Sequence, residues 1–263
     1  MSKSLSLGSA LLCALIWGTT FIAQETGMEL IGPYVFNGVR FFVGLFLFLG
    51  TYVQQTALLY TDVANAAFFT IFYVPMVPII VFFLFKKTIH WSVWPAVALC
   101  VLGGYLLTNF HNTEVRLGDT LVVIGALFWS LHIIYIGKII ETFDVPILIG
   151  LIQTFIVCIC SIIVALFFEE FILENILGQK LQILYAGSLS AGIAFVLQIY
   201  AQKNIQPTPS AIIFSLEGVI ATIAAWILLS QILNINNILG CIFILTGVLF
   251  SQLVPEIKKV NYK

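Results

Sequence analysis

Residues 146–168 read PILIGLIQTFIVCICSIIVALFF, a run without a single charged side chain. A helix that crosses the hydrocarbon core of a bilayer needs about 20 mostly apolar residues, so this run is long enough to span a membrane. Lipid offers the backbone no hydrogen-bonding partner, and a helix satisfies its own N–H and C=O groups. The run therefore predicts a transmembrane helix and an all-α fold.

The composition of the whole chain agrees with this stretch. Of its 263 residues, 61% are hydrophobic and 9% are charged, with a mean hydropathy of +1.10. Soluble domains carry roughly 25% charged residues, and one soluble core of this size could not bury so much apolar surface. The net charge of −1 argues against a nucleic-acid partner. The five cysteines lie in apolar stretches without metal-ligand spacing, which favours free thiols and no metal.

Eight further segments resemble residues 146–168, which predicts a polytopic membrane helical bundle of nine helices. Short polar or proline-containing joints separate them, as expected when loops lie at the two membrane surfaces. The nine segments are residues 5–24, 35–60, 65–85, 93–110, 119–139, 146–168, 181–202, 210–233 and 235–253.

The distribution of basic residues predicts the orientation of the chain. One side of the predicted membrane carries Arg116 and Lys180. The other side carries seven lysines, which are Lys86, Lys87, Lys138, Lys203, Lys258, Lys259 and Lys263. By the positive-inside rule, the lysine-rich side and the C-terminus are cytoplasmic. Nine crossings then place the N-terminus outside, although Lys3 alone prefers the cytoplasm.

The chain also repeats itself. Residues 14–17 read ALIW and residues 126–129 read ALFW, at an offset of 112. Further along, Gly103 matches Gly247 at an offset of 144, so the offset grows by 32 residues. Such self-similarity indicates two units of one architecture.

These matches divide the chain into two repeats, residues 5–110 and residues 119–253. The first repeat is short by about one helix and a loop, and the shortfall falls before the third segment. Segment 35–60 measures about 39 Å as one helix, which is less than two crossings need, so we expect one long helix there. The second repeat has an odd number of spans, so two such units in sequence have inverted orientations. Inverted repeats that meet at a midplane site are a recurring transporter plan.

Four motifs fit this repeat plan in order and spacing. They are WGTTF at 17–21, NGVRF at 37–41, YTDVANAAF at 60–68, and LG with TGV within 239–248. Together they resemble the EamA-type branch of the drug/metabolite transporter superfamily. The resemblance covers nearly the whole chain, and it implies ten helices in two inverted five-helix halves with both termini cytoplasmic. Known relatives are mostly exporters of amino acids, metabolites or drugs. This chain departs from that plan by the missing 32 residues and by Glu217-Gly218, where many relatives have Glu-Pro.

Glu217 is the strongest candidate for a functional residue, because polar groups inside lipid are costly and are retained for function. It lies in the middle of segment 210–233, far from either end. It would serve as a proton or cation site, or as an anchor for a substrate amine. Alternatively it is a structural partner of Arg40, which lies near the end of its own segment. Arg40 is either part of the substrate site or a side chain that snorkels to the membrane surface.

The other candidates are aromatic and amide side chains. Trp17 and Trp129 occupy equivalent repeat positions, and together with Tyr73 they are predicted to form the walls of a cavity. Gln198 and Gln153 could hydrogen-bond a substrate, although polar contacts between membrane helices are common.

Two further features belong to single segments. His132 is a lone histidine in the middle of its segment, and a neutral packed side chain is the simpler interpretation. Pro75 and Pro78 predict a kink in segment 65–85.

The leading functional hypothesis is a secondary carrier, an exporter or exchanger, that moves a small organic metabolite or drug by alternating access across the cell (inner) membrane. No hydrolase, metalloprotease or phosphate-binding motif occurs in the sequence, which predicts neither an enzyme nor a cofactor. The alternative is a non-transporting or degraded membrane protein derived from such a carrier, because the first repeat is short. An intramembrane enzyme would rest on Glu217 and His132 alone. A homodimer is left open.

Overall fold

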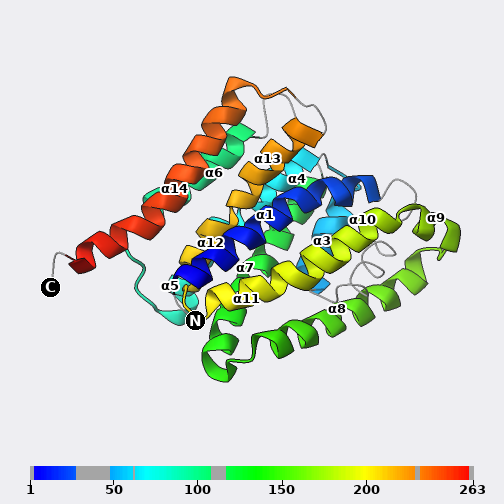
Figure 1. Cartoon of the computed structure of the whole chain (residues 1–263), viewed down its shortest axis with the longest axis horizontal. Coiled ribbons are helices and arrows are strands. Elements are labelled where there is room, and N and C mark those ends of the chain that lie inside the picture. The colour runs from blue at the N-terminus through cyan, green and yellow to red at the C-terminus, as the bar shows by residue number, and fades with distance from the viewer. Residues whose placement is uncertain (1–2, 28–47, 62, 108–116, 229–231, 261–263) are drawn as a thin grey trace.

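The computed structural model describes residues 3–27, 48–61, 63–107, 117–228 and 232–260 (Figure 1). Within these ranges every regular element is a helix, which confirms the all-α prediction. The elements are α1 (Lys3–Gly27), α3 (Phe48–Ala57), α4 (Val63–Thr70), α5 (Tyr73–Phe85), α6 (Val93–Leu107), α7 (Leu117–Phe143), α8 (Pro146–Phe168), α9 (Leu173–Gly178), α10 (Lys180–Leu184), the π-helix η1 (Tyr185–Ala194), α11 (Phe195–Gln202), α12 (Pro207–Phe214), α13 (Leu216–Leu228) and α14 (Ile235–Val260).

Six spans in the described ranges are long and apolar enough to cross a membrane. They are Ala66–Phe85, Leu117–Thr142, Pro146–Phe168, Lys180–Gln202, Pro207–Ala224 and Ile235–Val254. Two shorter apolar stretches, Ser4–Thr19 and Val93–Leu107, accompany them. Large apolar side chains such as Phe83 and Phe167 are 71% and 79% exposed, as lipid-facing residues should be.

The predicted count of nine helices stays a prediction. Segment 35–60 was expected to form one long helix, but residues 28–47 lie outside the described residues. Of that segment the structure gives α3, Phe48–Ala57, followed by a turn. The joint predicted at 169–179 holds a short helix of its own, α9.

Two spans are broken within their length, and the first break lies in segment 65–85, where a kink was predicted. The first break, between α4 and α5, lies at Ile71 and Phe72, where Pro75 has no N–H to donate to the Ile71 carbonyl. Val74 instead donates to Ile71 over three residues, at 2.9 Å. The second break, between α12 and α13, lies at Ser215, whose carbonyl accepts from Gly218 at 3.2 Å. Each break tightens one turn into 3₁₀ geometry.

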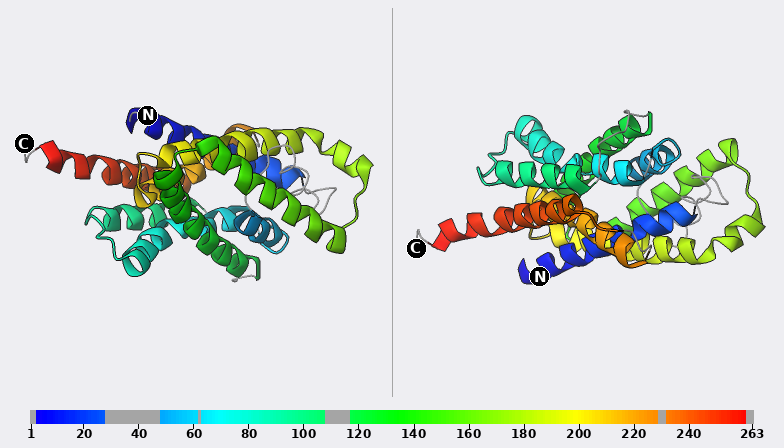
Figure 2. Two further views of the ribbon diagram at one scale, coloured as in Figure 1. Left: turned by 90° about the horizontal axis from the view of Figure 1, so that it is seen from below. Right: turned by 90° about the horizontal axis from the view of Figure 1, so that it is seen from above.

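The helices pack in a reciprocal pattern. Helix α1 packs against α12 and α13, and α7 packs against α4 and α5. Helices α6 and α14 lie side by side at one edge of the molecule, and α8 lies at the other edge (Figures 1 and 2). At the α6–α14 crossing, a Cβ on Gly103 would lie 2.6 Å from the Gly240 carbonyl oxygen, and a Cβ on Gly240 would lie 2.6 Å from the Gly103 carbonyl oxygen. Glycines thus let these two backbones approach closely.

The bundle has two distinct ends. The lysine end, as we call it, holds Lys86, Lys87 and Lys138 around one cavity. The opposite end holds Asp119, which begins α7 and accepts a hydrogen bond from the Thr61 hydroxyl.

The start of α1 and the end of α14 both lie at the lysine end. The Asn204 side chain donates to the Ser6 hydroxyl at 2.9 Å, and its neighbour Lys203 forms an ion pair with Asp144 just beyond α7. Near the end of α14, Ser251 lines the same cavity as the lysines. The prediction that the N-terminus and C-terminus lie on opposite sides is therefore wrong.

Helix α1, and not α3, runs against the direction that nine crossings require. A Cβ on Gly50 would meet the Trp129 ring, so the start of α3 lies beside Trp129. A Cβ on Gly118 would meet the Ala57 carbonyl oxygen, so the end of α3 lies beside the first turn of α7. Helices α1 and α3 thus both run toward the opposite end, and the residues that connect them, 28–47, lie outside the described residues. Helix α1 begins at the lysine end, so the conflict noted from the sequence does not arise. That this end faces the cytoplasm stays a prediction.

Candidate functional site

An aromatic cluster occupies the middle of the bundle. Trp17 of α1 lies 6.2 Å from Trp129 of α7 between ring centroids, 5.1 Å from Phe195 of α11 and 5.5 Å from Phe214 of α12. Trp129 stacks on Phe195 at 5.8 Å with an interplanar angle of 4°. Four helices therefore meet through aromatic rings, whereas a role of Trp17 and Trp129 as cavity walls stays a prediction. Phe195 and Phe214 were not predicted.

Tyr73 and Glu217 meet at the two helix breaks. The Tyr73 hydroxyl donates to Glu217 Oε1 at 3.4 Å, and both side chains are buried, at 3% and 8% exposure. Tyr73 begins α5, and Glu217 lies in the first turn of α13. Glu217 thus lies in the interior of the span Pro207–Ala224, directly after the break at Ser215. A helix N-terminus is a favourable position for a carboxylate.

Close backbone contacts join this pair to the two tryptophans. A Cβ on Gly18, next to Trp17, would lie 2.5 Å from the carbonyl oxygen of Glu217. In the other half, the Ser130 hydroxyl next to Trp129 lies 3.4 Å from the carbonyl oxygen of Tyr73. The structure thus brings Trp17, Trp129, Tyr73 and Glu217 together.

Gln198 belongs to a neighbouring polar group between α7, α8 and α11. It is fully buried, and its amide donates to Gln202 at 3.3 Å, which in turn donates to the Ile133 carbonyl at 2.7 Å. His132 Nε2 pairs with Gln153 Oε1 at 3.1 Å. Four buried polar atoms here have no hydrogen-bond partner, which are Trp129 Nε1, His132 Nδ1, Gln153 Nε2 and Gln198 Oε1.

Unpaired polar atoms are costly in an apolar interior, so this group is part of the candidate site rather than packing alone. From the sequence, His132 was interpreted as a packed side chain, and its pairing with Gln153 was not predicted. The signal available was a polar residue in each of two adjacent apolar segments. Arg40 lies outside the described residues, so its predicted pairing with Glu217 stays a prediction.

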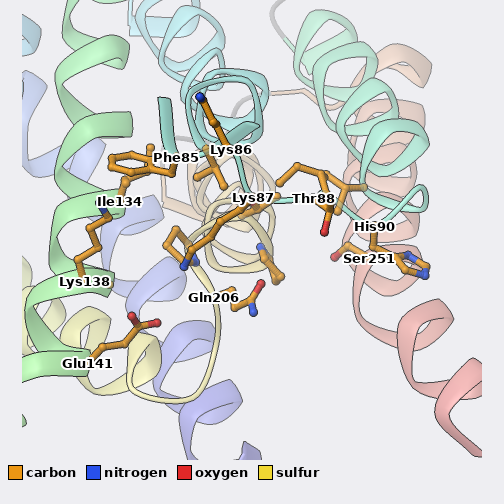
Figure 3. Close-up of a pocket in the computed structure, with 17 residues that line it drawn as sticks. Phe85, Lys86, Lys87, Thr88, His90, Ile134, Lys138, Glu141, Gln206 and Ser251 are labelled. Carbon is orange, nitrogen blue, oxygen red and sulfur yellow. The ribbon is translucent and has the colours of Figure 1, made fainter. Parts of the chain in front are cut away.

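A cavity of about 580 Å³ opens at the lysine end (Figure 3). The ends of α5 and α7 and the start of α12 surround it, and α6 and α14 contribute one wall. Its wall residues Val81 and Ile134 lie on the same helices as Tyr73 and Trp129, respectively. The cavity therefore lies between the lysine end and the aromatic centre.

The fold defines an all-α integral membrane protein. The EamA-like transporter family matches residues 116–253 of the chain. An uncharacterized transporter of Archaeoglobus fulgidus is 30% identical over 267 residues, covering 94% of this chain and 85% of the relative. The uncharacterized transporter YoaV of Bacillus subtilis is 23% identical over 282 residues, covering 94% of this chain and 96% of the relative.

One solved crystal structure shares the fold, with a TM-score of 0.84 and 14% identity over 97% of this chain and 99% of the other. The chain belongs to the EamA-like transporter family. Membership of a transporter family implies a carrier and not an enzyme.

Proposed function

We propose that this chain is a secondary carrier that moves a small organic solute across the cell membrane by alternating access. The two moving units are two inverted halves, residues 5–110 and 119–253. No nucleotide-binding motif occurs in the sequence, so a solute or ion gradient supplies the energy. The direction is export or exchange, by likeness to the family.

Pairing of equivalent residues at the centre is the observation that carries this proposal. Trp17 and Trp129 are equivalent at an offset of 112 and lie 6.2 Å apart. Tyr73 and Glu217 are equivalent at an offset of 144 and are joined by a 3.4 Å hydrogen bond. A residue that faces its own counterpart lies on a pseudo-two-fold axis, and such an axis is where transporters with inverted repeats bind their solutes.

The helix breaks support the same proposal. The breaks at Ile71 and Ser215 are separated by the same offset of 144. Discontinuous helices at a midplane site expose helix ends and backbone carbonyls to a solute. The reciprocal packing of α1 on α12–α13 and of α7 on α4–α5 is the pattern that a two-fold relation produces.

Each site residue has a role in this scheme. Trp17 and Trp129 flank the solute, and Gln198 hydrogen-bonds it. Leaving the Glu217 carboxylate ionised and alone in an apolar interior is costly, so its charge must be matched by a proton or by a cationic group of the solute. Tyr73 orients Glu217. This exchange of proton for solute on one carboxylate would couple the two fluxes.

The two ends of the bundle differ as alternating access requires. At the opposite end, Thr61 bonds Asp119, and a Cβ on Gly118 would lie 2.6 Å from the Ala57 carbonyl oxygen, so α3 and α7 are closely packed. At the lysine end, α5, α7 and α12 leave the 580 Å³ cavity. This arrangement fits a state that is open toward the lysine end.

Counterflow in proteoliposomes tests the proposal. The vesicles are preloaded with a panel of metabolites and assayed for uptake of the labelled compounds. We expect Glu217→Gln to abolish coupled uptake while the protein remains folded, and Glu174→Gln, an acid-to-amide change on exposed α9, to have no effect. Likewise Tyr73→Phe should reduce uptake, and the exposed Tyr135→Phe should not. Uptake unchanged by Glu217→Gln would remove that residue from the mechanism. A wild-type protein that moves nothing in the panel would favour the non-transporting alternative.

A further inference from the structure

The cavity at the lysine end combines an apolar wall with a cationic rim. Val81, Val93 and Ile134 line it and are at most 8% exposed. The rim is formed by the chain that leaves α5 and by the last turns of α7. A volume of about 580 Å³ lies within the roughly 300–1,000 Å³ that small-molecule sites occupy.

The charges on the rim are unbalanced. Lys86, Lys87 and Lys138 line the cavity together with a single carboxylate, Glu141, which leaves an excess of two positive charges. None of the three lysines forms an ion pair within the described part of the chain, in contrast to Lys203, which pairs with Asp144.

The lysine side chains are placed by specific contacts. The Lys138 ammonium lies 3.3 Å from the centre of the Phe85 ring, a cation–π contact that holds it beside the end of α5. Figure 3 shows Lys87 extending across the opening toward the side on which Lys138 and Glu141 stand. Lys86 ends α5 in the left-handed conformation, with φ 50° and ψ 28°, which is strained for a residue other than glycine or asparagine. The turn at Lys86 directs the next residue, Lys87, over the cavity.

We propose that this cavity binds an organic anion with an apolar body. Its carboxylate or phosphate contacts Lys87 and Lys138 through charge-assisted hydrogen bonds, and its apolar part lies against Val81 and Ile134. A role of the cavity as an entrance to the central site would rest on the proposed function, whereas the binding itself does not. The headgroup of an anionic lipid carries the same chemistry and is the second possible source of the anion.

Binding of benzoate to the full chain in phosphatidylcholine nanodiscs tests the proposal. We expect wild-type protein to bind radiolabelled benzoate, and neutral benzyl alcohol, at the same concentrations, not to compete. Lys87→Gln and Lys138→Gln should each weaken benzoate binding about tenfold or more, because a charge-assisted contact is lost. The control Lys180→Gln removes an exposed lysine at the start of α10 and should leave binding unchanged. Binding should also weaken as salt is raised.

A second arm identifies the source of the anion. In nanodiscs with phosphatidylglycerol, native mass spectrometry counts the lipids that stay bound to wild type and to the double variant Lys87→Gln/Lys138→Gln. Benzoate binding in phosphatidylcholine discs supports a soluble anion. If the wild type but not the double variant retains phosphatidylglycerol, and the wild type does not bind benzoate in the phosphatidylcholine discs, the result supports a lipid headgroup.

Three results would overturn the proposal. The first is that the wild type binds neither benzoate nor phosphatidylglycerol, and the second is that benzyl alcohol binds as well as benzoate. The third is that Lys180→Gln weakens benzoate binding as much as Lys87→Gln does. The assay needs no gradient, so a failure of the transport proposal would appear separately, as normal benzoate binding without counterflow.

Discussion

Replacing Gly18 by alanine tests the contact between α1 and the break at Glu217. A Cβ at this position would lie 2.5 Å from the Glu217 carbonyl oxygen, 2.7 Å from the Ile220 Cβ and 2.9 Å from the Ala221 nitrogen. Comfortable heavy-atom separations are about 3.5–4.0 Å, so α1 must move away from α13 by roughly 1 Å. Two of these neighbours are backbone atoms, which cannot turn aside as a flexible side chain would.

The expected cost follows from two opposing effects. Overpacking of a tight interior costs about 1–3 kcal/mol, and the better helix propensity of alanine returns up to about 1 kcal/mol. We therefore expect Gly18→Ala to lower the free energy of unfolding by roughly 1–2 kcal/mol. The displacement also moves Glu217 relative to Tyr73, so the rate of counterflow should fall.

Gly8→Ala is the matched control in the same helix, because a Cβ there would have no neighbour within 4 Å. It should be neutral or slightly stabilising, since only helix propensity changes. Thermal unfolding of both purified variants in one detergent, followed by the counterflow assay, makes the comparison. If Gly18→Ala is as stable and as active as Gly8→Ala, the close contact of α1 with the break is not part of the working structure.

Two further predictions concern helix packing and topology. Gly103→Ala and Gly240→Ala should each destabilise the protein, but the double variant should cost less than the sum, because both clashes are relieved by one separation of α6 from α14; additive losses in thermal unfolding would contradict the shared crossing. Protease-sensitive tags at the two termini should be cleaved from the same face of oriented vesicles, and the positive-inside rule makes that face cytoplasmic; cleavage from opposite faces would restore the odd number of crossings.

The positions of the membrane helices were predictable because apolar length is a local property of the sequence. Segment 146–168 was predicted with the bounds that α8 has, and segment 119–139 was extended by a few residues at each end in α7. The helix breaks were harder to predict from the sequence. Pro75 predicted a kink in the first broken span. Near Ser215 the sequence has no proline, and only the Glu217-Gly218 dipeptide indicated a departure from a regular helix.

The repeat singled out two of the residues that the structure brings together. Trp17 and Trp129 were selected as equivalent positions, and they meet. Phe195 and Phe214 were missed because a membrane helix is apolar on all faces, so hydrophobic periodicity does not tell which aromatic ring points inward. The pairing of His132 with Gln153 depends on where α8 lies relative to α7, which the sequence alone does not specify.

The relation between the two ends during transport can be followed with two spin-label pairs in a background free of the five native cysteines. One pair, at Thr88 and Gln206, spans the cavity at the lysine end, and the other, at Leu59 and Thr120, spans the packed opposite end. Double electron–electron resonance distances are measured in nanodiscs at several pH values, with and without the solutes that show counterflow. Alternating access predicts that whenever the Thr88–Gln206 distance shortens, the Leu59–Thr120 distance lengthens. Distances that change together, or that stay fixed under every condition, would contradict a carrier that works by opening one end at a time.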